Sequence, residues 1–199
     1  MQNFNIILFN NFETLDVFGP VEVIGKLGNC NIEYFSLEGG SVKSSQNVRV
    51  VTLPVSDIES GGILLIPGGF GTREEINNAE LVNKIKKHCI EADYVLTVCT
   101  GSALLAKTGL LNGIMATSNK VSFDWVREQN QAVTWIRKAR WTKDGKYYTS
   151  SGVSAGIDMT LGFIADTVSL NAAQKIADGI EYIWNKDKEN DPFSTKAGE

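Results

Sequence analysis

Three short, almost continuous apolar segments constrain the fold of this 199-residue chain more than any other feature. Residues 4–9 (FNIILF), 62–66 (GILLI) and 94–98 (YVLTV) contain too few polar side chains for strands with one face in water. Segments of this kind are typical of strands buried on both faces of a parallel sheet. Each is followed by a helical pattern or a glycine-rich turn, so the sequence predicts an α/β fold.

The remaining elements follow from periodicity and turn signals. A helix is predicted within residues 16–27, with Pro20 in its first turn, where the missing N–H costs little. Asp144–Gly145 is a strong two-residue hairpin signal. Further strands are expected at 32–37, 48–53, 134–142 and 146–150, and further helices at 80–91, 102–107, 121–129, 155–167 (capped by Ser154) and 171–184. This order predicts a doubly wound, mostly parallel sheet with helices on both faces, in which sites gather at the carboxyl ends of the strands.

The composition fits one globular domain, because 43% of the residues are hydrophobic and 21% are charged. We expect residues 1–199 to form this single domain, with a polar tail at 186–199. The formal charge of -4 gives the surface no basic field, so neither a nucleic acid nor a membrane is an expected partner. A small-molecule substrate fits better.

The three cysteines bear on the cellular compartment. Cys30, Cys89 and Cys99 are widely spaced and form no metal-ligand pair, so we expect neither metal nor cofactor, and a reducing environment. The amino terminus lacks a basic signal region, and no apolar run approaches the roughly 18 residues of a membrane span. We therefore expect a soluble, unprocessed, cytoplasmic protein.

Cys99 is the strongest candidate for a chemical role. It stands between the buried segment 94–98 and the helix predicted at 102–107, at a turn that Gly101 allows to be sharp. A thiol over the first turn of a helix meets free amide N–H groups and the positive end of the helix dipole, so we expect its pKa to be lowered. The alternative is a buried, inert cysteine.

A glycine-rich loop should reach the same edge of the sheet. Residues 67–71 (PGGFG) can expose the backbone N–H groups of Gly68, Gly69 and Phe70. Together with the amide of Thr100, they could form an oxyanion pocket for a substrate. A glycine turn after a strand is also common for conformational reasons alone.

Asp16, Ser151 and Gly152 are weaker candidates. Asp16 is a single acid in an apolar helix start, where it is either a helix cap or, if it faces Cys99, a carboxyl of raised pKa that transfers a proton. Ser151 and Gly152 follow the predicted hairpin and either line the same cleft or form a plain turn before the next helix.

The chain resembles the DJ-1/PfpI superfamily over nearly its whole length, through four segments in this order: DVFGP at 16–20, IPGG at 66–69, VCTGS at 98–102 and SGVSAGID at 151–158. The branches it resembles most are the isocyanide hydratases and the amidotransferase-like sensor domains of AraC-type regulators. The resemblance implies a flavodoxin-like sandwich of the class I glutamine amidotransferase type, usually a homodimer, with the cysteine on a strained nucleophile elbow. For the hydratase branch it implies that Cys99 attacks the terminal carbon of an isocyanide, that Asp16 manages protons and that Thr100 supports the cysteine. A thioimidate would then be hydrolysed to an N-substituted formamide.

Several positions differ from the patterns of other branches. Thr100 stands where the protease-like branch has a histidine, and Asp16 where the DJ-1 branch usually has a glutamate. Asn119 replaces a histidine frequent in such hydratases, which leaves the substrate open, although an amide can still bind a ligand. The only histidine, His88, lies in a charged helical pattern that predicts a surface position. Catalysis must therefore use a cysteine and a carboxylate instead of a Cys-His-acid triad.

Four functions remain open at this point. The leading hypothesis is a cysteine-dependent hydro-lyase that adds water to an isocyanide or a similar small electrophile. The first alternative is an oxidative-stress sensor in which Asp16 stabilises a sulfenic or sulfinic acid at Cys99. A non-catalytic ligand-binding module ranks lower, because we expect no DNA-binding region after Glu199. A deglycase or glyoxalase is disfavoured by the missing histidine.

Overall fold

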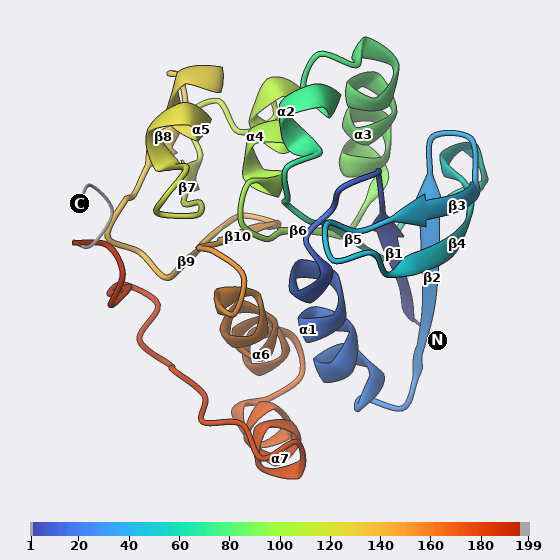
Figure 1. Cartoon of the computed structure of the whole chain (residues 1–199). Helices are drawn as coiled ribbons and strands as arrows, with labels where there is room; N and C mark the ends of the chain where they lie inside the picture. The colour runs from blue at the N-terminus through green and yellow to red at the C-terminus, as the bar shows by residue number, and fades with distance from the viewer. Residues whose placement is uncertain (1, 196–199) are drawn as a thin grey trace.

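A computed structural model describes residues 2–195 and shows an eight-stranded sheet between two layers of helices (Figure 1). The strand order is β3-β4-β2-β1-β5-β6-β10-β9. The strands from β4 to β10 in this order run parallel, and β3 and β9 pair antiparallel at the two edges. The strands of this sheet are β1 (Gln2–Ile7), β2 (Cys30–Ser36), β3 (Gly40–Lys43), β4 (Arg49–Pro54), β5 (Ile63–Ile66), β6 (Tyr94–Thr97), β9 (Trp141–Asp144) and β10 (Tyr147–Ser150). The α/β, flavodoxin-like fold expected from the sequence is confirmed.

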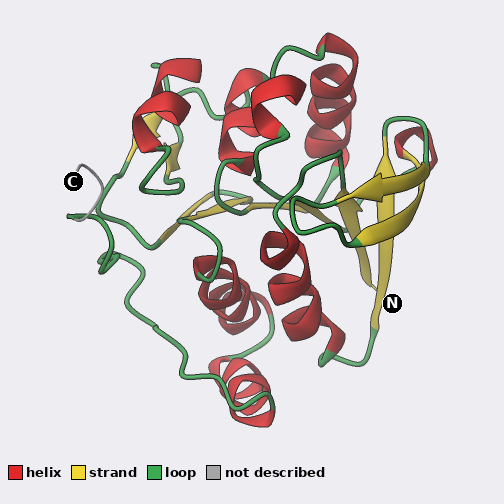
Figure 2. Ribbon diagram, viewed as in Figure 1, coloured by secondary structure: helices red, strands yellow, loops and turns green. Residues whose placement is uncertain are grey.

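Helices cover both faces of the sheet, and Figure 2 shows the strands enclosed between them. In Figure 1, α1, α6 and α7 lie on one face, and α2, α3 and α4 lie on the other, with α5 beside α4. The helices are α1 (Thr14–Gly25), α2 (Thr72–Glu75), α3 (Ala79–Glu91), α4 (Gly101–Lys107), α5 (Phe123–Gln129), α6 (Ala155–Thr167) and α7 (Leu170–Gly179), with a 3-10 turn η1 at Val55–Asp57. Within residues 2–195, no helix is both long and apolar enough to cross a membrane.

The central strands supply the core, as their apolar sequences predict. All four side chains of β5 are buried, and so are the last four of β1. Strands buried on both faces need helices above and below, and this explains why the helices alternate between the two sides of the sheet. The carboxyl ends of β1, β5, β6 and β10 consequently lie side by side at one edge.

Several local predictions were wrong because tertiary contacts override local signals. The first helix begins at Thr14, so Pro20 lies inside α1, where its missing N–H removes one helical hydrogen bond. Ser154 has helical dihedral angles, and its side chain makes no capping hydrogen bond to α6. His88 is buried with 2% exposure instead of lying on the surface.

One strand was not predicted, and two predicted elements have different boundaries in the structure. The sequence analysis missed β3, because only Val42 in that segment is buried and the alternation is too short to detect. Only the last part of the predicted strand 134–142 joins the main sheet, as β9. Its first residues form β8 (Thr134–Trp135), which pairs with β7 (Met115–Ala116) in a separate sheet. The last helix ends at Gly179 and not at residue 184.

The polar tail is held against β9 and the segment before it. The amide of Arg140 donates to the carbonyl of Lys188 at 2.8 Å, and the amide of Asp191 donates to the carbonyl of Lys138 at 2.7 Å. Asp191 is only 3% exposed. The tail is therefore attached at Lys188 and Asp191, and residues 196–199 of the predicted tail lie outside the described residues.

Asp158 of α6 connects the core to this tail through a buried carboxylate. Its Oδ2 accepts hydrogen bonds from Nε of Arg140 at 2.7 Å and from a second guanidinium nitrogen at 2.6 Å. Its Oδ1 accepts from the hydroxyl of Tyr182 at 3.1 Å and from the amide of Asn185 at 2.9 Å. Because Asp158 is fully buried and Arg140 nearly so, neither charge has water as an alternative partner.

Replacing Asp158 with asparagine is expected to lower the free energy of unfolding by about 3–5 kcal/mol, because the variant removes the nearer carboxylate of the buried Arg140 and leaves only Asp191, at 3.7 Å. Asp166→Asn is the matched control, since Asp166 pairs with Lys143 at 3.0 Å and both side chains are 42% exposed. An exposed pair of this kind contributes about 0–1 kcal/mol. Urea denaturation of both variants measures the difference, and equal losses would contradict the role assigned to Asp158.

Candidate active site

The four neighbouring strand ends bring the predicted site segments together. The loop after β1 leads into α1 and Asp16, and the loop after β5 contains the glycines at 67–71. The turn after β6 carries Cys99, and residues 151–153 follow β10. Binding at the carboxyl edge of a parallel sheet is the general rule for this architecture.

The backbone of Cys99 adopts a left-handed conformation, with φ of 56°. Its N–H donates to the carbonyl of Ser151 at 3.2 Å. Its own carbonyl accepts hydrogen bonds from the hydroxyls of Ser118 at 2.8 Å and Ser102 at 3.0 Å. A non-glycine residue keeps a positive φ only when its surroundings impose it, and these bonds come from three different segments. The turn after β6 therefore holds the Cys99 side chain in one direction.

Two glycines allow the neighbouring segments to approach this turn. A side chain at Gly101 would overlap the carbonyl groups of Ile66 and Pro67 at the end of β5. A Cβ atom at Gly68 would lie 2.7 Å from the hydroxyl of Thr100 and 2.9 Å from Oδ2 of Asp16. Both positions are therefore restricted to glycine by close packing around the cysteine.

The sulfur of Cys99 lies beneath the surface, and the residue is only 6% exposed. Burial raises the pKa of its thiol, and the negative charge of Asp16 raises it further. The backbone N–H groups of Thr100 and Val153 donate to the sulfur and act in the opposite direction. The lowered pKa expected from the helix terminus was therefore wrong, because desolvation outweighs the amide donors of a short helix. Burial therefore favours the protonated form of the thiol.

Asp16 lies against Cys99 and is completely buried. Its Oδ2 accepts a hydrogen bond from the amide of Gly68 at 2.9 Å, so the carboxyl does not cap α1. Within residues 2–195, Oδ1 has no nitrogen or oxygen partner, and the carboxyl interacts with the side chain of Cys99. Burial raises the pKa of Asp16 well above its usual range, against the effect of the Gly68 amide. The two groups form a buried acid–thiol pair.

The amides of the glycine loop donate hydrogen bonds to the side chains around Cys99. The amide of Gly68 is bonded to Asp16, and the amide of Gly69 donates to the hydroxyl of Thr100 at 3.1 Å. The prediction that these two amides form an oxyanion pocket was therefore wrong. Both amides already donate to acceptors within the protein, and neither is free to bind a substrate oxygen. The N–H groups that meet at the sulfur come instead from Thr100 and Val153.

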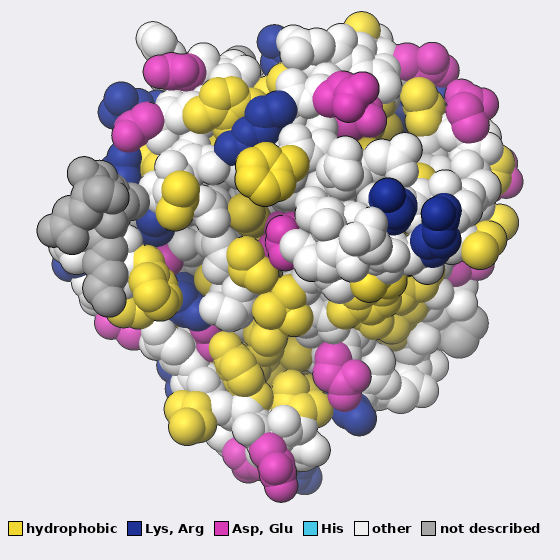
Figure 3. All heavy atoms as spheres, in the orientation of Figure 1, with side chains coloured by type: hydrophobic (Ala, Val, Ile, Leu, Met, Phe, Trp, Pro, Cys, Tyr) yellow, Lys and Arg dark blue, Asp and Glu magenta, His cyan; other side chains and the backbone are white. Residues whose placement is uncertain are grey.

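A cavity of about 200 Å³ opens above the sulfur. Its wall is formed by ten residues, which are Glu13, Gly69, Phe70, Arg73, Cys99, Thr100, Asn119, Val121, Ser122 and Val153. Phe70 and Val121 are 78% and 89% exposed, and they form an apolar rim. Figure 3 shows apolar side chains gathered near the centre of this face of the molecule. The volume admits only a small molecule.

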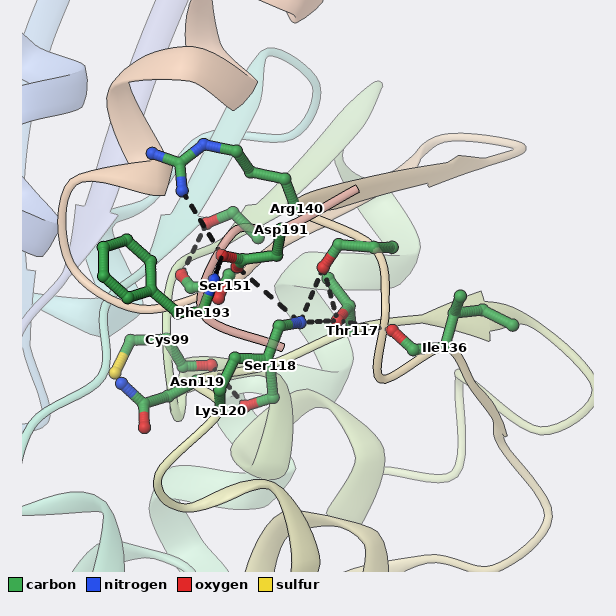
Figure 4. Close-up of polar contacts among 12 residues, drawn as sticks. Cys99, Thr117, Ser118, Asn119, Lys120, Ile136, Arg140, Ser151, Asp191 and Phe193 are labelled. Carbon is green, nitrogen blue, oxygen red and sulfur yellow. Dashed lines mark hydrogen bonds and ion pairs between the residues drawn. The ribbon is translucent and has the colours of Figure 1, made fainter. Parts of the chain in front are cut away.

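The remaining predicted residues lie at or behind this cavity. Asn119 lines it, and Figure 4 shows its amide alongside the side chain of Cys99. Gly152 contacts the Asn119 amide, and a Cβ atom there would overlap it. Ser151 uses its carbonyl to hold the Cys99 backbone, so its contribution is structural support from behind the cavity.

A buried ionic cluster supports the loop that carries Asn119 (Figure 4). Nζ of Lys120 donates to the hydroxyl of Thr117 at 2.9 Å and to the carbonyl of Ala139 at 2.6 Å. It also lies 3.9 Å from Oδ2 of Asp191 in the tail. Burial lowers the pKa of Lys120 to about 8, and Asp191 acts in the opposite direction. The tail thus contacts Lys120, the residue that follows Asn119 of the cavity wall.

Five residues of the cavity wall were not predicted from the sequence, and these are Glu13, Arg73, Val121, Ser122 and Val153. Arg73 lies two residues after the glycine loop, and a cation in that position was a signal that could have been used. Val153 has a φ of 31°, which no feature of its sequence indicates. Within residues 2–195, no group of three or more histidine, cysteine or acidic side chains is arranged to hold a metal ion.

Fold and site together define a class of protein: a flavodoxin-like α/β domain with a cysteine on a strained turn at the carboxyl edge of its sheet. The family model for the DJ-1/PfpI family matches residues 3–166, and the chain belongs to this family. The resemblance inferred from the four sequence segments is confirmed.

Two curated proteins are similar to this chain over most of its length. An isonitrile hydratase from Pseudomonas putida is 28% identical over 177 residues, which cover 88% of this chain and 76% of the relative. The HTH-type transcriptional regulator CdhR from Pseudomonas aeruginosa is 25% identical over 183 residues, which cover 89% of this chain but only 54% of the regulator. The chain thus spans about half the length of the regulator.

Solved structures show the same fold. A ThiJ/PfpI family protein from Pseudomonas syringae has a TM-score of 0.85 and is 26% identical, with 92% of this chain and 76% of that chain covered. Drosophila melanogaster DJ-1beta has a TM-score of 0.78 at 19% identity, with 92% of this chain and 99% of that chain covered. At 19% identity, the second comparison concerns the fold alone.

Proposed function

We propose that the protein hydrates a small isocyanide to an N-substituted formamide, with Cys99 as the nucleophile and Asp16 as the group that moves protons. The observation that carries this proposal is the buried contact between the Asp16 carboxyl and the Cys99 side chain, at the floor of a small cavity. Similarity to an isonitrile hydratase at 28% identity supports it.

The raised pKa values of the pair suit a reaction that begins from a thiol. The Asp16 carboxylate accepts the thiol proton as the sulfur forms a bond to the terminal carbon of the isocyanide, and it then donates this proton to the same carbon. The product is a thioimidate, R–N=CH–S–Cys. Addition of one water molecule across the C=N bond and cleavage of the C–S bond give R–NH–CHO and restore the thiol. One water is consumed for each formamide.

The groups around the sulfur have separate tasks in this reaction. The N–H groups of Thr100 and Val153 stabilise negative charge on the sulfur while the proton is on Asp16. The hydroxyl of Thr100, which accepts from the Gly69 amide, keeps the loop after β5 in contact with the cysteine turn. Asn119 offers an amide to the substrate at the cavity wall.

Incubation of the pure protein with a simple aryl isocyanide tests the proposal. We expect catalytic formation of the N-aryl formamide, detected by liquid chromatography with mass spectrometry, at a rate proportional to protein concentration. Heat-denatured protein is the control for uncatalysed hydration. Absence of formamide with both aryl and small alkyl isocyanides, from protein whose circular dichroism is that of a folded α/β domain, would reject the proposed activity.

Oxidation of Cys99 is a second candidate function, and one observation favours it. Burial raises the pKa of Asp16, so the protonated carboxyl can donate a hydrogen bond to an oxygen on the adjacent sulfur. Peroxide titration followed by intact mass distinguishes the two functions. A sensor takes up one or two oxygen atoms stoichiometrically at Cys99 and turns over no isocyanide, whereas the proposed enzyme produces formamide without oxidation.

We further propose that the protein is a homodimer, as the resemblance to its superfamily implies. Size-exclusion chromatography with light scattering tests this directly, and a mass of one chain would reject it. All three cysteines are free thiols in the structure, which fits the expected cytoplasmic location.

A further inference from the structure

Arg73 is the one cationic side chain among the described residues that line the Cys99 cavity, and the proposed reaction does not use it. It is the second residue of α2, directly after the glycine loop. Burial lowers the pKa of its guanidinium, and a charge on Cys99 acts in the opposite direction, so the two side chains interact electrostatically across the cavity. A molecule bound above the sulfur therefore lies within the field of a guanidinium.

The guanidinium is held in place by neutral groups. It stacks on the ring of Trp125, with Cζ 3.9 Å from the ring centroid. One terminal nitrogen donates to the hydroxyl of Ser122 at 2.7 Å, and the other donates to the hydroxyl of Thr72 at 3.0 Å. These contacts fix the plane of the guanidinium and reduce the conformational entropy that binding a ligand would cost.

None of the ion pairs formed within residues 2–195 includes Arg73. The contrast with Arg140 is informative, because that buried guanidinium is paired with Asp158. A guanidinium has five N–H donors in a planar fork that matches a carboxylate. The structure thus provides a fixed, partly buried cation whose charge is not compensated by a carboxylate of the described chain.

Glu13 is the acidic residue of the cavity wall, and it forms no ion pair with Arg73. It precedes α1, and its charge acts on Asp16. Arg73 is attached through Ser122 and Trp125 to the start of α5. An anionic ligand would therefore be drawn to the α5 side of the cavity and away from Glu13.

We propose that Arg73 determines the specificity of the Cys99 cavity and selects small electrophiles that carry a carboxylate. This inference rests on the proposed function for the nature of the electrophile, and on the geometry of Arg73 for the carboxylate. With about 200 Å³ available, the carboxylate and the reacting carbon can be separated by only a few atoms. Isocyanoacetate has this arrangement, and its methyl ester is the matched neutral compound.

A structural role for Arg73 is the competing explanation. Thr72, which accepts from Arg73, donates its hydroxyl to the hydroxyl of Thr100 at 3.1 Å. Loss of Arg73 could thus disturb the residue next to Cys99 without any effect on ligand charge. The decisive measurement must compare an anionic reagent with a neutral one at the same sulfur.

Alkylation of Cys99 by iodoacetate and iodoacetamide provides this comparison and does not depend on hydration. In both reactions the sulfur forms a bond to the methylene carbon, iodide leaves, and the thiol proton passes to solvent. The rate is followed on the Cys99 peptide by mass spectrometry, so that Cys30 and Cys89 do not contribute. We expect Arg73→Gln to lower the iodoacetate-to-iodoacetamide rate ratio about tenfold, and Arg73→Lys to retain most of it.

Arg49→Gln, which removes one exposed positive charge from β4, is the control and should leave the ratio unchanged. If Arg73→Gln slows both reagents by the same factor, Arg73 acts on the sulfur or on Thr72, and the proposal is overturned. For the substrates themselves, we expect a kcat/KM preference for isocyanoacetate over its methyl ester that Arg73→Gln abolishes. If the wild-type protein hydrates neither compound, the proposed function fails, while the alkylation ratio still decides the role of Arg73.

Discussion

Cys99→Ser is expected to abolish isocyanide hydration, with kcat/KM reduced by about 10³-fold or more. A serine hydroxyl has the same shape but a far higher pKa, and Asp16 cannot remove its proton at neutral pH. The left-handed backbone at this position depends on hydrogen bonds donated by the hydroxyls of Ser102 and Ser118 and on one accepted by the carbonyl of Ser151, all of which the variant keeps. We therefore expect an unchanged fold, measured by circular dichroism and thermal unfolding beside the kinetic assay.

Cys30→Ser is the matched control for this prediction. Cys30 lies at the start of β2, at the opposite end of the sheet from the site, and is only partly buried. Its replacement should leave kcat/KM within about twofold of the wild-type value. Undiminished turnover by a folded Cys99→Ser variant would reject Cys99 as the nucleophile.

Asp16→Asn is expected to reduce kcat/KM by about 10²-fold or more, because the amide cannot accept the thiol proton and return it to carbon. The substitution is nearly isosteric, and the amide oxygen can still accept the hydrogen bond from Gly68. A loss below about twofold would assign Asp16 a merely structural role.

The Asp16→Asn variant should also make the Cys99 thiol easier to ionise, although it slows hydration. The negative charge of Asp16 raises the pKa of the thiol, so its removal lowers that pKa. Titration of thiolate absorbance, with a Cys99→Ser sample as the blank, should show this shift, and iodoacetamide should react faster at pH 7. A variant that alkylates faster but hydrates more slowly is the signature of a proton-transfer partner.

Stability should change with pH in a direction fixed by the Asp16 pKa. Because burial raises the folded-state pKa, the wild-type protein loses stability as the pH rises above the ordinary carboxyl range and through the raised value. Asp16→Asn does not suffer this loss, so it should be more stable than the wild type at pH 7, by about 1.4 kcal/mol for each unit of the shift that is titrated. Below about pH 3.9 the difference should disappear. Denaturant titrations at both pH values test this.

The parts of the fold that were predicted correctly are those in which local pattern and tertiary environment agree. The apolar segments that became β1, β5 and β6 are buried on both faces, so their sequences alone identify them. Edge strand β3 and the small sheet of β7 and β8 depend on distant partners, and their sequences carry too little pattern to detect. Pro20 shows the same limit, because packing of α1 tolerates a proline that local rules place at a helix start.

Some features of the candidate site could also be predicted from the sequence, and others could not. The positions of Cys99 and Asp16 follow from strand ends that must meet at one edge of a parallel sheet, and the structure places them together. The direction of the Cys99 pKa shift could not be predicted, because it depends on how completely the sulfur is removed from water. Arg73 was not predicted, although a cation this near the glycine loop was a usable signal; that none of the ion pairs within residues 2–195 includes it is visible only in the three-dimensional arrangement.

Rapid-quench mass spectrometry of the protein mixed with excess aryl isocyanide tests the proposed chemistry most directly. We expect a transient increase equal to the full mass of the isocyanide, located on the Cys99 peptide, that forms and decays at rates matching formamide release. Formamide production while the Cys99 peptide stays unmodified at every time point would contradict it.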